Sequence, residues 1–142
     1  MVNVLDKVQP KNKEQLKQLI NYAFKHNIYD LNFIDTSKIT EMSNLFINCE
    51  YDIDVSDWDV SNVKDMTGMF YCCKNFDCDL SNWNVSNVTD MYSMFTACEN
   101  FKGKGLDNWD VSKAEDMRFM FYNCKNFNCD LSNWDMSKAL RI

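Results

Sequence analysis

The stretch DLSNWNVSNVTDMYSMFTACENF, from Asp79 to Phe101, decides the fold because most of its pattern returns elsewhere in the chain. One unit of the repeat is written D-V-S-x-V-x-D-M-x-x-M-F-x-x-C-x-x-F-x-x-D-L-S-N-W. Four tryptophans mark the units at spacings of 25, 26 and 25 residues: Trp58, Trp83, Trp109 and Trp134. A repeat of this period is typical of units that stack on their neighbours and share one core.

The repeat divides the chain into an entry segment, four full units and a remainder. The entry segment, residues 1–34, contains a predicted helix over about 13–26. Asn12 stands three residues before Gln15, the spacing of a capping box at a helix N-terminus. We expect this helix to cover the first unit as an N-terminal cap. The four units are 35–58, 59–83, 84–109 and 110–134, and residues 135–142 form a partial fifth repeat.

The apolar positions of one unit predict a short strand and a short helix. Leu80, Trp83 and Val85 resemble the L-x-x-L-x-L strand of leucine-rich repeats. The apolar residues of 63–73 recur at steps of three and four, as on one face of a short α-helix or 3₁₀ turn. The predicted fold is therefore a repeat solenoid, leucine-rich-repeat-like, with a short strand plus a short helix or 3₁₀ turn per 25-residue coil and an N-terminal helical cap.

Two sets of repeated polar residues could cap the predicted helices. Asn62 and Asn87 stand three residues before Asp65 and Asp90, a pattern of N-cap and first-turn acid. Serines at a neighbouring position could cap instead: Ser37, Ser61, Ser86 and Ser112. Both choices give these residues a structural role rather than a nucleophilic one.

Composition and charge narrow the classes of partner. The chain has 46% hydrophobic residues, enough for a core, and a net charge of −6. Residues 1–34 carry a small positive excess, so the repeats carry the negative charge. An acidic repeat region argues against a nucleic-acid partner, which needs clustered lysine and arginine. No apolar run approaches the ~20 residues of a membrane span, and no signal peptide is visible at the N-terminus.

The seven cysteines are an odd number, so they cannot all pair within one chain. Four of them recur with the repeat, as small core residues do: Cys49, Cys73, Cys98 and Cys124. Free thiols and the lack of a visible signal peptide favour a cytoplasmic location. The alternative is a secreted or cell-surface protein, in which Cys73 and Cys98 lie close enough to pair.

Catalytic, metal and cofactor motifs are absent from the sequence. His26 is the sole histidine, which leaves little for a relay with serine or cysteine. The acidic pair Asp52-x-Asp54 lacks the glycine and glutamate of a helix-loop-helix calcium site. No glycine-rich phosphate loop or zinc-protease motif is present. We expect no metal, no cofactor and no enzymatic activity.

Two sets of residues are candidates for contact with a protein partner. One is a polar ribbon beside the tryptophans, expected on a concave sheet and suited to a basic protein surface. It contains Asp57, Asp59, Asn82, Asn84, Asn108, Asp110, Asn133 and Asp135. The other set comes from two positions at which the units disagree, and its apolar and aromatic members are Ile47, Tyr71, Tyr122 and Phe119. The alternative for the second set is that these rings only pack on neighbouring coils.

With the units and the entry helix in view, the chain resembles the BspA-like family of bacterial leucine-rich-repeat proteins. The resemblance rests on NFIDTSKITEMSNLF at 32–46, on LSNWNVSNVTDMYSMF with its copies, and on VQPKNKEQLKQLI before them. It implies a solenoid used for binding and adhesion, often at bacterial surfaces. No catalytic residues are carried over.

The expected function is therefore a non-catalytic module for protein–protein interaction. One alternative is a fragment of a surface-exposed adhesin. Another is a structural protein that self-associates, as a homodimer, through an open C-terminal end. Leu140 and Ile142 are the candidate residues for that contact, since they leave apolar surface at the end of the repeats.

Overall fold

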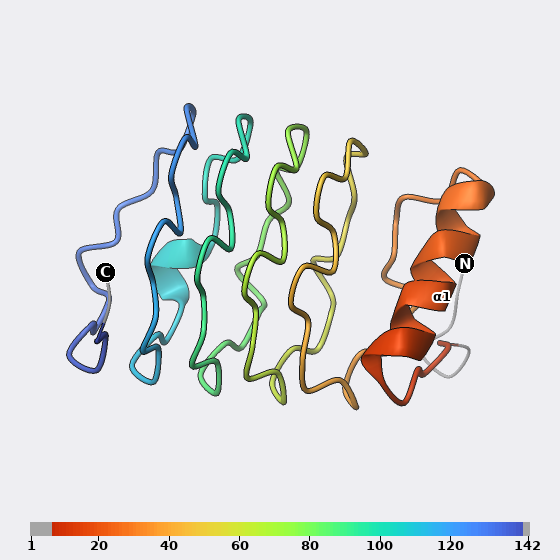
Figure 1. Cartoon of the computed structure of the whole chain (residues 1–142), viewed down its shortest axis with the longest axis horizontal. Helices are drawn as coiled ribbons and strands as arrows, with labels where there is room; N and C mark the ends of the chain where they lie inside the picture. Colours follow the sequence, from red (N-terminus) through yellow and green to blue (C-terminus); the bar gives the residue numbers. More distant parts are fainter. Residues whose placement is uncertain (1–6, 141–142) are drawn as a thin grey trace.

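The computed structural model describes residues 7–140, which form one α-helix and a row of stacked coils. Helix α1 (Lys13–Lys25) lies at one end of the row, and successive coils follow in chain order (Figure 1). A 3₁₀-helix, η2 (Leu106–Asn108), lies within unit 84–109. No helix in residues 7–140 is both long enough and apolar enough to cross a membrane.

The predicted strand and short helix of each coil are both wrong, and the fold is not a leucine-rich-repeat-like solenoid. Within residues 7–140 the coils pair through isolated parallel bridges, such as that between Asp65 and Asp90, and form no β-strand. The segment 66–73 forms consecutive turns, in which Met69 N–H donates to Met66 O (3.2 Å). Turns closed between residues three apart place buried side chains at steps of three and four, and this spacing imitates a helix.

Alternate amides of these turns bond to the next coil instead of to their own. In unit 59–83 the donors are Met66, Gly68, Phe70 and Cys72, and the acceptors are the carbonyls of Asp90, Tyr92, Met94 and Thr96, at N···O distances of 2.8–2.9 Å. Units 35–58 and 84–109 repeat the arrangement. We call this set of bonds the amide ladder. Because every second amide points out of its coil, the segment cannot close an α-helix.

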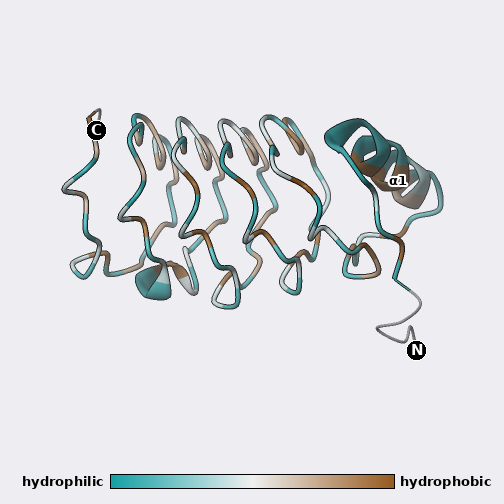
Figure 2. Cartoon of the chain, turned by 90° about the horizontal axis from the view of Figure 1, so that it is seen from below, coloured by the Kyte–Doolittle hydropathy of each residue, from teal (hydrophilic) through white to brown (hydrophobic). Residues whose placement is uncertain are grey.

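The core consists of columns that run through the stack. Phe46, Phe70, Phe95 and Phe121 lie in one column, with neighbouring ring centroids 5.5–5.8 Å apart and nearly parallel planes. Figure 2 shows hydrophobic residues at matching places in successive coils. The tryptophans form a second column, in which each indole N–H donates to a carbonyl of the preceding coil. Identical units therefore bury identical residues against one another.

The repeated cysteines form a third column. The thiols of Cys73, Cys98 and Cys124 each donate to a carbonyl of the preceding coil at S···O distances of 2.8–2.9 Å. Burial raises the pKa of Cys73 to about 12 and also raises that of Cys98. All seven cysteines are free thiols in this structure. The column therefore holds neutral thiols that act as hydrogen-bond donors inside the core.

Helix α1 begins at the predicted cap. Asn12 Oδ1 accepts from Gln15 N–H (2.9 Å), and the side chain of Gln15 accepts in turn from Lys11 N–H (2.9 Å). Its buried residues, Leu16, Ile20 and Ala23, join the core of the stack. Lys13 Nζ lies 3.0 Å from Glu41 Oε1 and so ties the start of the helix to the first unit.

The asparagines and serines predicted as caps have a different role, because no helix follows them. Ser61 N–H donates to Asp59 Oδ1 (3.0 Å), which makes a turn stabilised by an aspartate side chain. Asn62 and Asn87 instead donate from their side-chain amides to carbonyls of the preceding coil, those of Ser37 and Ser61. The prediction of helix caps is therefore wrong, and both sets hold the turns and coils together.

These turns predict a measurable titration effect at Asp110. Ser112 donates to Asp110 Oδ1 from its hydroxyl (2.6 Å) and its backbone N–H (3.0 Å), and both bonds lower the pKa of Asp110. We expect Ser112→Ala to raise the pKa of Asp110 toward its ordinary value, as measured by NMR titration of the carboxyl carbon. The pKa of Asp79, which Ser81 lowers, is the internal control and stays unchanged. An unmoved Asp110 pKa would show that the hydroxyl is not the cause.

The sign of the effect on stability follows from the same bonds. A carboxylate whose pKa is lower in the folded chain stabilises the fold above its unfolded pKa of about 3.9. That contribution is lost as the pH falls through the folded value. The Ser112→Ala variant therefore loses part of the contribution from Asp110 above about pH 4 and resembles the parent chain at lower pH.

Candidate functional site

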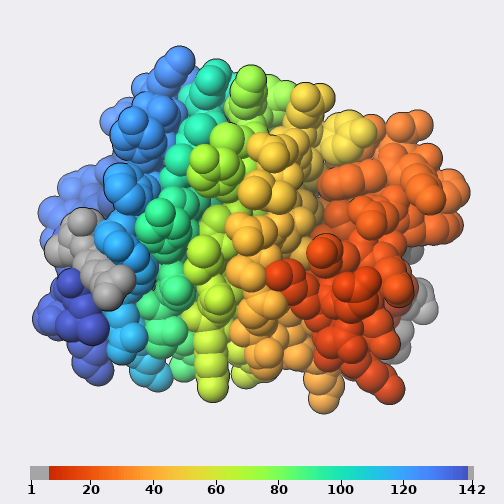
Figure 3. All heavy atoms as spheres, viewed as in Figure 1, coloured from red at the N-terminus to blue at the C-terminus, as the bar shows by residue number. Residues whose placement is uncertain are grey.

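A groove with a volume of about 380 Å³ crosses all four units. Its lining includes Ile47, Tyr71, Tyr92, Phe119 and Tyr122, and we call it the aromatic groove. The segments that carry it, 41–49, 64–73, 89–98 and 115–124, run along the near side of the coils in Figure 1. Figure 3 shows this side, on which the coils lie in contact as parallel bands. The two variable positions of the repeat therefore come together on one surface.

One of these positions has a left-handed backbone in every unit. Asn44, Gly68, Ser93 and Phe119 have φ angles of 56°, 59°, 53° and 58°. Glycine and asparagine accept this conformation readily, whereas a bulky residue there loses about 1–2 kcal/mol. The ring of Phe119 is also 55% exposed. The fourth unit therefore combines an unfavourable backbone with an exposed aromatic ring.

Phe119 is held in place by its neighbours. Thr96 Oγ1 donates to Phe119 O at 2.5 Å, which fixes the turn. The Phe119 ring meets Tyr92 and Tyr122 nearly at right angles, with centroid distances of 5.9 and 6.0 Å. Such edge-to-face pairs are favourable beyond the area they bury. The aromatic cluster is therefore held by contacts within the chain.

A paired arginine closes one side of this cluster. Arg118 Cζ lies 5.1 Å from the centre of the Tyr92 ring, within the range of a cation–π contact. Its Nε and Nη2 donate to the two carboxylate oxygens of Asp116 at 3.1 and 2.9 Å. The sequence interpretation missed Tyr92, although its position also varies between units, from Ser43 to Thr67 to Arg118. That variation was the available signal.

The four apolar candidates differ in exposure. Ile47, Tyr71, Phe119 and Tyr122 are all partly exposed, and Tyr122 has the largest exposed fraction at 58%. The smaller members of the same positions, Ser93 and Thr96, are buried in the floor of the groove. The surface therefore offers aromatic rings and an aliphatic side chain beside hydroxyl and amide groups.

The polar ribbon does not lie on a concave sheet, because the coils within residues 7–140 pair only through isolated β-bridges and form no strand. All eight of its residues are exposed and lie beside the buried tryptophans, with Asn108 at the end of η2. Asp59, Asn84, Asp110 and Asp135 each accept an N–H from the serine two residues later. None of the eight lines the aromatic groove. The two candidate sets are therefore separate surfaces.

The groove lining supports contacts by hydrogen bonds and apolar packing. It contains hydroxyl, amide, aromatic and aliphatic side chains, with no carboxylate, histidine or cysteine among the described lining residues. Residues 7–140 hold no group of three or more histidine, cysteine, aspartate or glutamate side chains placed to bind a metal.

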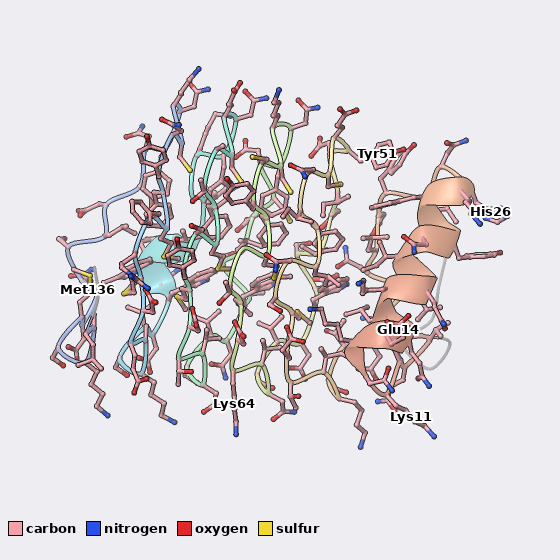
Figure 4. The ribbon with its side chains drawn as sticks, in the orientation of Figure 1. Lys11, Glu14, His26, Tyr51, Lys64 and Met136 are labelled. Carbon is pink, nitrogen blue, oxygen red and sulfur yellow. The ribbon has the colours of Figure 1, made fainter. Side chains whose placement is uncertain are left out.

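The last coil has a second cleft, with a volume of about 390 Å³, which we call the end cleft. It is lined by apolar residues that include Phe121, Leu131, Trp134 and Met136. Figure 4 shows Met136 at the end of the row opposite α1. Leu140, predicted to support self-association, is 80% exposed. Ile142, its predicted companion, lies outside the described residues.

Comparison with known proteins gives one match. A family model described as "Mycoplasma protein of unknown function, DUF285" matches residues 14–134. The match covers most of α1 and all four repeat units. Searches of curated proteins and of solved structures gave no significant match.

Proposed function

The chain belongs to the family described as Mycoplasma protein of unknown function, DUF285, and for this member we propose a non-catalytic, protein-binding function through the aromatic groove. The observation that carries the proposal is Phe119, an exposed ring on a left-handed backbone within that groove. The equivalent positions of the other units hold asparagine, glycine and serine.

The left-handed backbone at Phe119 destabilises the free chain. A left-handed phenylalanine is strained by about 1–2 kcal/mol, and its exposed ring recovers little of that by burial. Strained residues of this kind cluster at binding sites, where the surrounding structure holds them. A partner that covers the ring would recover the apolar burial. This argument supports a contact role for Phe119.

The composition of the groove favours a protein segment as its ligand. Tyrosine is one of the residue types that most often dominate the energy of protein interfaces, and phenylalanine is enriched in their composition. Amide and hydroxyl groups such as Asn44 and Thr67 can orient a peptide backbone. The volume of the groove falls within the range of about 300–1,000 Å³ found for ligand pockets. A loop or extended peptide with an apolar anchor fits these features.

The polar ribbon would attract a partner electrostatically. Its carboxylates, with the net charge of −6, favour encounter with a basic partner. Because the ribbon does not line the groove, we assign it to long-range attraction rather than to the contact itself. Raising the ionic strength should therefore lower the association rate constant and have a smaller effect on the dissociation rate constant.

Kinship with BspA-like leucine-rich-repeat proteins is part of the same proposal. It is supported by the repeat pattern and by the family match, whereas the turn-based backbone departs from the strand and helix implied by that kinship.

We propose a cytoplasmic location, supported by the odd number of cysteines and the buried thiol column. A surface adhesin is the alternative, and labelling of the partly exposed thiols of Cys72 and Cys129 on intact cells distinguishes the two locations.

A displayed-peptide selection tests the binding function. Random peptides are selected on the full chain, and their affinities are then measured by calorimetry for the parent chain and for two variants, Phe119→Asn and Tyr122→Ala. We expect each variant to weaken binding at least about tenfold, or 1.4 kcal/mol, since each loses an aromatic contact. Peptides that bind all three chains equally, or a selection that yields no binder, would overturn the proposal.

Stability measurements provide the control for this selection. Phe119→Asn should be at least as stable as the parent chain, because asparagine accepts the left-handed backbone. Tyr71→Ala and Tyr122→Ala should change the free energy of unfolding by less than about 1 kcal/mol, because both rings are partly exposed. Strong destabilisation by either tyrosine variant would instead assign that ring to the core.

A further inference from the structure

A row of carboxylates lies beside the aromatic groove. Isolated parallel bridges join one position of successive coils, and this position holds Glu41, Asp65, Asp90 and Asp116. Bridged segments lie about 4.8 Å apart, so the row places like charges on neighbouring coils, which destabilises the free chain. We call these four residues the carboxylate row. It shares no residue with the polar ribbon.

The two middle members of the row bond to the backbone of groove residues. Asp65 Oδ1 accepts from Thr67 N–H at 2.9 Å. Asp90 Oδ1 accepts from Tyr92 N–H at 3.0 Å. Thr67 and Tyr92 both line the aromatic groove. A ligand in the groove is therefore within reach of these two carboxylates.

The two ends of the row have basic partners within the chain, and its middle does not. Lys13 Nζ lies 3.0 Å from the first carboxylate of the row, and Arg118 Nη2 lies 2.9 Å from the last. Among residues 7–140, no lysine or arginine nitrogen lies within 4.0 Å of a carboxylate oxygen of Asp65 or Asp90. Lys64, next to Asp65 in the sequence, points outward at the edge of the stack (Figure 4). The uncompensated negative charge therefore lies at the second and third units.

Arg118 shows how this surface holds a guanidinium. Its Nε and Nη2 donate to the carboxylate of Asp116, and its Cζ lies 5.1 Å from the centre of the Tyr92 ring in the preceding unit. Arginine suits both contacts, since its planar fork binds a carboxylate through two donors and also stacks on rings. The equivalent of Arg118 in unit 59–83 is Thr67, a short side chain that precedes Gly68. The second unit therefore has the carboxylate of this arrangement without the arginine.

Asp65 is the better centre for an incoming cation. Asp116 raises the pKa of Arg118 through a hydrogen bond, and the charge of Asp90 adds to that effect, so Asp90 already acts on a cation of the chain. Arg118 is also the sole arginine among residues 7–140, and it is paired. These residues therefore offer no free arginine from a second copy, which favours a different protein as its source.

We propose that the segment bound by the aromatic groove carries an arginine that binds Asp65, while an apolar residue of the same segment contacts Phe119. This inference rests on the proposed binding function and adds the charge and spacing of the partner. Neighbouring rings of the phenylalanine column lie 5.5 and 5.8 Å apart between the second and fourth units. About three to five residues of extended chain, at ~3.3 Å each, therefore separate the arginine from the apolar anchor.

Two displayed-peptide libraries test the inference on the full chain. They share random flanks and differ at the central position, which holds arginine in one library and glutamine in the other. The arginine library should yield at least about tenfold more binders, since a hydrogen bond between charged groups is stronger than one from a neutral amide. An apolar residue should be enriched about three to five positions from the arginine. Equal yields overturn the inference and leave the proposed function standing, whereas no binder from either library overturns both.

Variants of the full chain localise the arginine. Asp65→Asn should weaken binding of the selected arginine peptides at least about tenfold, because it removes the charge and keeps an oxygen for the turn. Asp110→Asn is the matched control, since Asp110 makes the same kind of turn in the polar ribbon, and it should change the affinity less than about twofold. Asn84 occupies the equivalent position and makes that turn already. Peptides that lose affinity for Phe119→Asn but not for Asp65→Asn would overturn the inference and keep the proposed function.

Light scattering of the free chain tests the source of the arginine. We expect no self-association that depends on Asp65. Association that Asp65→Asn abolishes would identify a second copy as the occupant and would overturn the proposal of a partner segment.

Discussion

Replacement of Trp83 by alanine is expected to lower the free energy of unfolding by about 3–5 kcal/mol. The indole is 4% exposed and lies in the middle of the tryptophan column, 6.2 Å from Trp109 in a parallel stack. It also meets the phenylalanine column at Phe70, with a centroid distance of 6.0 Å. Its Nε1–H donates to Val55 O at 2.9 Å. Alanine would leave a cavity between two columns and an unpaired carbonyl.

Urea denaturation of the parent chain and of matched variants measures this effect. Trp134→Ala is the control, because Trp134 ends the column and its ring faces the end cleft, so we expect a smaller loss. Trp83→Phe keeps an aromatic ring but removes the bond to Val55 O and part of the indole volume, so we expect a smaller loss of about 1–3 kcal/mol. A loss below about 1 kcal/mol for Trp83→Ala would contradict the burial of this indole between the tryptophan and phenylalanine columns.

The columns themselves could be predicted from the sequence, because comparison among units separates fixed positions from free ones. Phe70, Cys73 and Trp83 recur in every unit and are buried. The residues of α1 could also be placed, since Asn12 and Gln15 form a local signal that does not depend on distant contacts. What repeats along the chain packs together in the stack.

The path of the backbone between these columns could not be predicted. A step of three or four residues arises from a helix and from consecutive turns alike, and the segment 66–73 takes the second form. The difference lies in where alternate amides donate, and side-chain spacing does not report that direction. The left-handed backbone at Cys72 and Phe119 also has no local signal, because neither residue type favours it.

The candidate groove was predictable in part for the same reason. Tyr71, Phe119 and Tyr122 occupy positions at which the units disagree, and the stack brings those positions onto one surface.

The second large effect is expected at Gly105. Unit 84–109 is one residue longer than its neighbour 59–83, and Gly105 absorbs the extra residue with a φ angle of 94°. A Cβ atom there would collide with the backbone of Ser81 and Leu80 in the preceding coil. Leu80 N–H donates to Lys104 O at 3.1 Å, so the two coils cannot separate without losing that bond. Gly105→Ala should therefore cost about 3 kcal/mol, from left-handed strain and overpacking together.

Gly68→Ala makes the same chemical change without the backbone collision. Gly68 also has a left-handed backbone, with φ at 59°, but the obstacle to its Cβ is the side-chain oxygen of Asn44, which can rotate away. We expect a loss of only about 1 kcal/mol there, the cost of a left-handed alanine. Thermal unfolding of the two variants compares these costs directly. Equal losses would mean that the contact between coils tolerates a methyl group, and that the extra residue of unit 84–109 is accommodated by flexibility rather than by Gly105.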